Sequence, residues 1–153
     1  LSGDWSSDVC SSDLPAFLDT TGIACIRHAI EVRHPSFARP EFLAQLRRYN
    51  VALVTADTAE WPGFDQTADF AYLRLQGAPG AESYAAAERS VRAGWLADLA
   101  TGRVPDGAQM LELAELARRH ETCSFFVSTD KEHAPANARA VMAELGLKGP
   151  GEQ

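Results

Sequence analysis

The chain has 153 residues and a net charge of −7, with 14 basic residues against 21 acidic ones. This length is compatible with a single domain that has a sizeable core. The acidic balance gives no electrostatic footprint for nucleic acid or an anionic membrane surface, and no apolar run approaches the roughly 20 residues that cross a bilayer. Cys10, Cys25 and Cys123 lack the spacing of a metal site or a disulfide framework. We therefore expect a cytoplasmic protein with reduced thiols.

Residues 1–14 differ in composition from the rest of the chain. They are rich in Ser and Asp and contain no basic residue, and their apolar residues follow neither a helical nor a strand period. A secretory signal would need a basic start and a continuous apolar stretch. Because the string resembles the translation of a sequencing-library adapter, we interpret it as a non-native, disordered leader; a native disordered tail is the alternative. Residues 15–147 are then the C-terminal part of a domain that begins upstream, and residues 148–153 are a frayed tail.

Four short apolar stretches predict buried strands: "HAIEVRH" (28–34), "VALVTAD" (51–57), "FAYLRLQG" (70–77) and "SFFVSTD" (124–130). Helical periodicity predicts helices over 40–50, 82–102, 108–120 and 135–146. In the second of these, apolar spacing predicts a buried face of Tyr84, Ala87, Val91, Trp95 and Leu99. The alternation of strands and helices indicates an α/β fold with a parallel sheet covered by helices.

Polar residues fall on one parity of each predicted strand, toward its carboxyl end. Successive strand side chains point to opposite faces, so Glu31 shares a face with Arg33, and Tyr72 shares one with Arg74. A polar face opposite the helices is typical of the inside of a (β/α) barrel, whose sites form at the carboxyl ends of the strands. We expect the following residues to converge at such a mouth: Glu31, Arg33, His34, Asp57, Arg74 and Asp130.

Two interpretations of these residues without a function stay open. Glu31 with Arg33 or Arg74 is equally well explained as a compensated ion pair, because buried charges must be paired. A lone His34 at the end of a strand and before Pro35 is at least as well explained as a local hydrogen-bonding or capping residue.

The strings "AIEVRHPSF", "VALVTADT", "FAYLRLQG" and "DKEHAPANA", in this order, resemble the C-terminal half of the YecE-like family, the domain of unknown function numbered 72. The resemblance implies a TIM barrel of about 250 residues, of which this chain would supply roughly strands five to eight. A half barrel exposes strand edges and an unfilled interior, so self-association is an expected property.

The family pattern has Glu-aromatic-Arg-His on the fifth strand and Tyr-x-Arg-x-His-Gly on the seventh. Glu31, Arg33 and His34 match the first pattern, where Val32 replaces the aromatic residue. The second pattern is matched by Tyr72, Arg74 and Gly77. Gln76 stands where the family usually has a His, which puts proton transfer or metal ligation at that position in doubt.

No reaction follows from a fold alone. Our leading hypothesis is a hydrolase- or lyase-type site for a small anionic substrate, in which Glu31 or Asp57 is the general acid or base and His34 assists. The predicted substrate-binding residues are Arg33, Tyr72, Arg74, Gln76 and Asp130. The cofactor is unknown, and no metal site is predicted from this part of the barrel, because it holds no compact His/Asp/Glu ligand set and the missing strands could supply further ligands. The alternatives are a non-catalytic binding module, with nucleic acid as one ligand class, and an inactive fragment.

Overall fold

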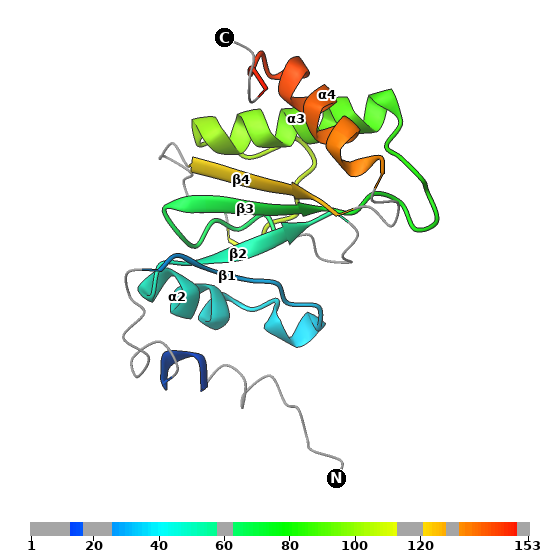
Figure 1. Ribbon diagram of the computed structural model, residues 1–153. Helices are drawn as coiled ribbons and strands as arrows, with labels where there is room; N and C mark the ends of the chain where they lie inside the picture. The colour runs from blue at the N-terminus through cyan, green and yellow to red at the C-terminus, as the bar shows by residue number, and fades with distance from the viewer. Residues whose placement is uncertain (1–12, 17–25, 58–62, 113–120, 128–131, 150–153) are drawn as a thin grey trace.

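The computed structural model describes residues 13–16, 26–57, 63–112, 121–127 and 132–149 (Figure 1). Four strands form one sheet in the order β1-β2-β3-β4, and each neighbouring pair is parallel. The strands are β1 (His28–Ile30), β2 (Val51–Ala56), β3 (Phe70–Leu75) and β4 (Glu121–Phe126). The predicted α/β fold is confirmed. The sheet is open, with β1 and β4 at its two edges, and it is consistent with part of a (β/α)8 barrel.

The helices lie between and after these strands, as the alternation predicts. They are α2 (Pro40–Arg48), α3 (Ala86–Thr101) and α4 (Ala134–Glu144), with a short 3-10 helix, η1 (Pro35–Phe37), after β1. A proline in the first turn starts α2, and Gly102 ends α3 with a left-handed φ of 77°. Figure 1 shows α3 and α4 beside β3 and β4, and α2 beside β1 and β2.

The core lies between the sheet and these helices, in two clusters. Ala71, Leu73 and Leu75 of β3 pack against α3 and α4. On the same face, Val51 and Leu53 of β2 pack against α2. Full burial of a leucine side chain contributes about 1.5–3 kcal/mol, so this apolar face determines which side of the sheet the helices cover. The opposite face of the sheet is not covered by these helices.

Several predicted boundaries differ from the structure. β1 ends at Ile30, four residues early, and β4 spans Glu121–Phe126 instead of 124–130. Residues 108–112 are not helical, because the carboxylate of Asp65 accepts hydrogen bonds from the backbone N–H groups of Leu111 and Glu112. The rest of that predicted helix, residues 113–120, lies outside the described residues.

The predicted buried face of α3 is correct only in part. Leu99 is buried and Trp95 packs against the core, but Val91 is 49% exposed and Ala87 is also exposed. The buried positions on this helix include Ala93. Because alanines occur on several sides of α3, apolar spacing does not select one face.

Part of the predicted leader is described. Residues 13–16 form a helical turn, and Leu14 packs against the cluster between α2 and β2. Residues 1–12 and residues 150–153, which make up most of the predicted tail, lie outside the described residues. The leader and the tail therefore remain predictions. Within the described ranges, no helix combines the length and the apolar character needed to cross a membrane.

Candidate functional site

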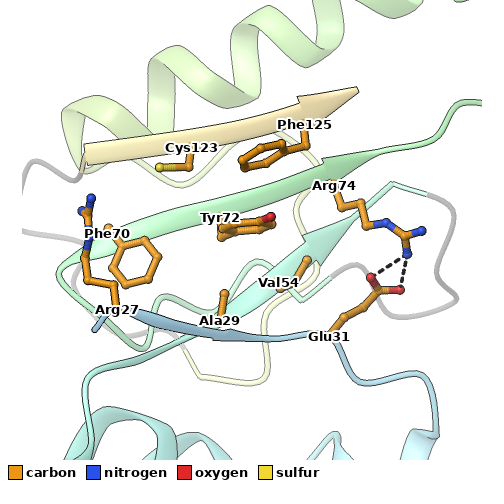
Figure 2. A pocket seen from close by; sticks show the side chains of 9 residues that line it. All are labelled: Arg27, Ala29, Glu31, Val54, Phe70, Tyr72, Arg74, Cys123 and Phe125. Carbon is orange, nitrogen blue, oxygen red and sulfur yellow. Dashed lines mark hydrogen bonds and ion pairs between the residues drawn. The ribbon is translucent and has the colours of Figure 1, made fainter. Parts of the chain in front are cut away.

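A pocket of about 520 Å³ lies on the sheet face opposite the helices (Figure 2). All four strands or their flanking residues line it. On β3 and β4 the lining residues are register partners, Tyr72 with Cys123 and Arg74 with Phe125. The full lining consists of Arg27, Ala29, Glu31, Val54, Phe70, Tyr72, Arg74, Cys123 and Phe125. The predicted inward face of β1 and of β3 is therefore the observed one.

A carboxylate and two guanidinium groups meet at the carboxyl end of β1 and β3. Arg74 Nη1 donates to both carboxylate oxygens of Glu31, at 2.9 and 2.7 Å, as Figure 2 shows. Arg33 Nε donates to Glu31 Oε1 at 3.0 Å. The side chains of Glu31 and Arg74 are 21% and 28% exposed, whereas Arg33 is 75% exposed. Glu31, Arg33 and Arg74 together therefore carry one net positive charge.

The surroundings of Glu31 keep it ionised. Burial by itself raises the pKa of this carboxyl group, but the hydrogen bonds and charges of Arg74 and Arg33 outweigh burial and hold the pKa below its ordinary value. At neutral pH Glu31 is therefore an anion that accepts hydrogen bonds from two arginines. Such a carboxylate is a weak base, since protonation would break the pairing.

Aromatic rings line the middle of the pocket. The rings of Tyr72 and Phe125 are stacked, with centroids 5.0 Å apart and an interplanar angle of 19°. Phe125 is 50% exposed. Because Phe125 is the register partner of Arg74, the exposed ring lies on the strand next to the arginine and on the same face.

A second ion pair lies at the amino-terminal end of the sheet. Arg27 Nη1 and Nη2 donate to the two carboxylate oxygens of Glu121 at 2.8 and 3.0 Å, and the Arg27 guanidinium lies 4.9 Å from the ring centroid of Phe70. This pair joins the residue before β1 to the first residue of β4, the two edge strands of the sheet. Its charges cancel, so the net positive charge comes from the carboxyl end of the sheet, where Arg33 adds a second cation just outside the pocket lining.

The expectation that Asp57 joins this group is wrong. Its carboxylate accepts hydrogen bonds from Tyr84 Oη at 2.6 Å and from the backbone N–H groups of Gln76 and Gly77 at 2.8 and 3.3 Å. Arg92 of α3 lies 3.3 Å from the same carboxylate, whose side chain is 0% exposed. The physical reason is register: Asp57 has the parity of Val51 and Leu53, which face the helices.

The other predicted site residues are not part of the pocket lining; Arg33 is one of them and lies just outside it, where it contacts Glu31. His34 is exposed, and its Nδ1 accepts a hydrogen bond from the backbone N–H of Ser36 at 3.3 Å and lies 2.7 Å from Ser36 Oγ. It therefore caps η1, as the local interpretation proposed. Gln76 follows β3 and uses its backbone N–H to bind Asp57. Asp130 lies outside the described residues.

The predicted site omitted several residues that line the pocket, among them Arg27 and Phe125. Arg27 has the parity of Ala29 and Glu31, so extending the first strand backward would have found it. Phe125 lies within the predicted fourth strand but was missed because the polar residues Ser128 and Asp130 indicated the opposite parity as the inward one. Nothing in the sequence indicated the contact of Arg92 with Asp57. No group of three or more His, Cys, Asp or Glu side chains within the described ranges is arranged to hold a metal ion.

A comparison with known protein families identifies the same family that the sequence motifs resemble. The family model described as "Protein of unknown function DUF72" matches residues 6–153, a range that begins inside the predicted leader. No curated protein sequence matches the chain.

Two solved structures have a similar fold. A DUF72 family protein of Thermotoga maritima has a TM-score of 0.65 at 23% identity, over 89% of this chain and 51% of its own. A DUF72 family protein of Enterococcus faecalis has a TM-score of 0.60 at 20% identity, over 89% of this chain and 56% of its own. The chain thus spans about half the length of these relatives. By its match to the family model, the chain belongs to the DUF72 family of proteins of unknown function.

Proposed function

We propose that the carboxyl end of β1 and β3 binds the anionic group of a small molecule. The observation that carries this proposal is the ratio of charges: Arg33 and Arg74 share one carboxylate, Glu31, and the set keeps one positive charge. Arginine presents several N–H groups in a planar fork that suits carboxylates. The contacts with Glu31 use Nε of Arg33 and Nη1 of Arg74, so further N–H groups of both side chains are available to a ligand.

In this proposal Glu31 positions the two arginines. The hypothesis of acid or base catalysis from the sequence gives way to a binding role for Glu31, because its ionised form is stabilised by both cations. Asp57 is no longer a candidate base, since its carboxylate is fully buried under α3. A binding role at the carboxyl ends of parallel strands also agrees with where sites form in (β/α) barrels.

Titration of the full chain with acetate, followed by the NMR shifts of backbone amides, tests the proposal. We expect saturable shifts at the ends of β1 and β3, and at least about tenfold weaker binding in Arg33→Gln and Arg74→Gln, because each variant loses a charged hydrogen-bond donor. Arg103→Gln is the control, since this exposed arginine follows the end of α3 and pairs with Asp98 of that helix. Shifts that do not saturate, or that persist unchanged in both site variants, would refute the proposal.

A further inference from the structure

We infer that the ligand of this pocket is a planar aromatic ring that carries a single carboxylate group. This inference rests on the proposed anion site and adds the chemistry of the rest of the molecule. Its basis is an exposed aromatic ring, that of Phe125, on the strand next to Arg74 and on the same face of the pocket (Figure 2).

The first step is the geometry of the two side chains. Arg74 and Phe125 are register partners on adjacent parallel strands, and both line the pocket. Neighbouring strands lie about 4.8 Å apart. The two side chains therefore leave neighbouring strands on the same face and line one pocket, so that a single ligand can contact both.

The second step is the exposure and orientation of the ring. Phe125 is 50% exposed, although large apolar side chains are usually buried. Stacking on Tyr72, with an interplanar angle of 19°, holds one face of Phe125 and limits its orientation. Aromatic rings prefer offset-stacked or edge-to-face partners, so a flat ring is the group that this held ring can bind most specifically.

The third step is the charge. Glu31 with its two arginines leaves one positive charge, and the pair of Arg27 and Glu121 adds none. A carboxylate carries one negative charge, whereas a phosphate monoester carries about 1.5 to 2 at neutral pH. The site therefore matches a monoanion such as a carboxylate better than a phosphate group.

Three probes of equal charge test the inference on the full chain: acetate, cyclohexanecarboxylate and benzoate, each titrated by NMR. Benzoate and cyclohexanecarboxylate are similar in size, but only benzoate is flat and aromatic. We expect benzoate to bind about 2- to 10-fold tighter than cyclohexanecarboxylate, the range expected for an aromatic pair. Equal affinity of the two ring compounds would overturn the inference.

Variants at Phe125 separate the ring from the anion site. Phe125→Leu should remove the preference for benzoate over cyclohexanecarboxylate, whereas Phe125→Tyr should keep both this preference and the affinity for benzoate. Val91→Ala, at an exposed apolar residue on α3, is the control and should change neither. If Phe125→Leu keeps the benzoate preference, the inference is wrong and the anion site stands; if acetate and benzoate both fail to bind the unmodified chain, the proposed function fails with it.

Discussion

The hydroxyl of Tyr84 donates a 2.6 Å hydrogen bond to Asp57 Oδ2 and links the segment before α3 to the end of β2. Tyr84 is 3% exposed and lies in the core cluster between β3 and the helices α3 and α4. The same carboxylate binds the backbone N–H groups of Gln76 and Gly77, which follow β3. One buried aspartate thus joins two neighbouring strand ends to the helix layer.

Removal of this hydroxyl should destabilise the fold. Tyr84→Phe leaves the ring in place but deprives a charged, buried acceptor of its shortest hydrogen bond, which costs about 1.5–3 kcal/mol in the free energy of unfolding. Urea denaturation followed by circular dichroism measures the change. Tyr72→Phe is the matched control, because no hydrogen bond joins the Tyr72 hydroxyl to a described residue. A loss of the same size in both variants would contradict the role of the bond to Asp57.

Tyr84 should also make the stability of the fold depend on alkaline pH. Burial and the hydrogen bond to Asp57 raise the pKa of Tyr84 well above its ordinary value of 10.0. In the unfolded chain this tyrosine ionises near pH 10, while in the folded chain it keeps its proton. The stabilisation is therefore fully present below pH 10 and decreases as pH rises beyond it. Urea denaturation between pH 8 and about 11 should show a steeper loss in the unmodified chain than in Tyr84→Phe; parallel curves would contradict this assignment.

Strand alternation correctly predicted which side chains of β3, and of the segment that contains β1, face the pocket. In "FAYLRLQG" the apolar Leu73 and Leu75 alternate with Tyr72 and Arg74, and the structure buries the leucines under the helices while the other two line the pocket. The sequence of β3 carries this information because only one of its faces is covered by helices. Glu31 could be placed in the same way from its alternation with Ile30.

The second strand carries no such signal. Every residue of β2 is buried, so its apolar sequence does not alternate and a polar residue at its end can face either way. The grouping of Thr55 with Asp57 suggested the inside of the sheet. Both are instead satisfied by partners elsewhere in the chain, the Gly63 carbonyl for Thr55 and the Tyr84 hydroxyl for Asp57. The apolar and polar pattern within the strand does not indicate hydrogen-bond partners that lie outside the strand.

The ion pairs of Glu31 should contribute to stability at neutral pH and not in acid. Because Arg74 and Arg33 hold the folded pKa of Glu31 below its ordinary value of 4.5, the stabilisation is present above pH 4.5 and is lost as pH falls through the lower folded pKa. Glu31→Gln should lower the free energy of unfolding by about 1–2 kcal/mol at pH 7, and this difference should shrink toward pH 3.

The control for this prediction is Glu121→Gln. Glu121 is also paired with an arginine, but its side chain is 63% exposed, so solvent and salt screen the interaction. We expect a smaller change that disappears in high salt. A difference for Glu31→Gln that stays constant from pH 7 to pH 3 would show that charge pairing is not its cause.

The two glycines after β3 allow backbone strain to be separated from packing against Tyr84. Gly77 and Gly80 have φ angles of 77° and 80°, a left-handed conformation that costs other residues about 1–2 kcal/mol. A Cβ at Gly77 would lie 3.3 Å from the ring of Tyr84, whereas nothing lies within 4 Å of one at Gly80. Gly80→Ala should therefore show the backbone cost alone, and Gly77→Ala should lose about 1 kcal/mol more, because the ring that binds Asp57 must shift. Equal midpoints of thermal unfolding for the two variants would mean that Tyr84 accommodates the methyl group without weakening its bond to Asp57.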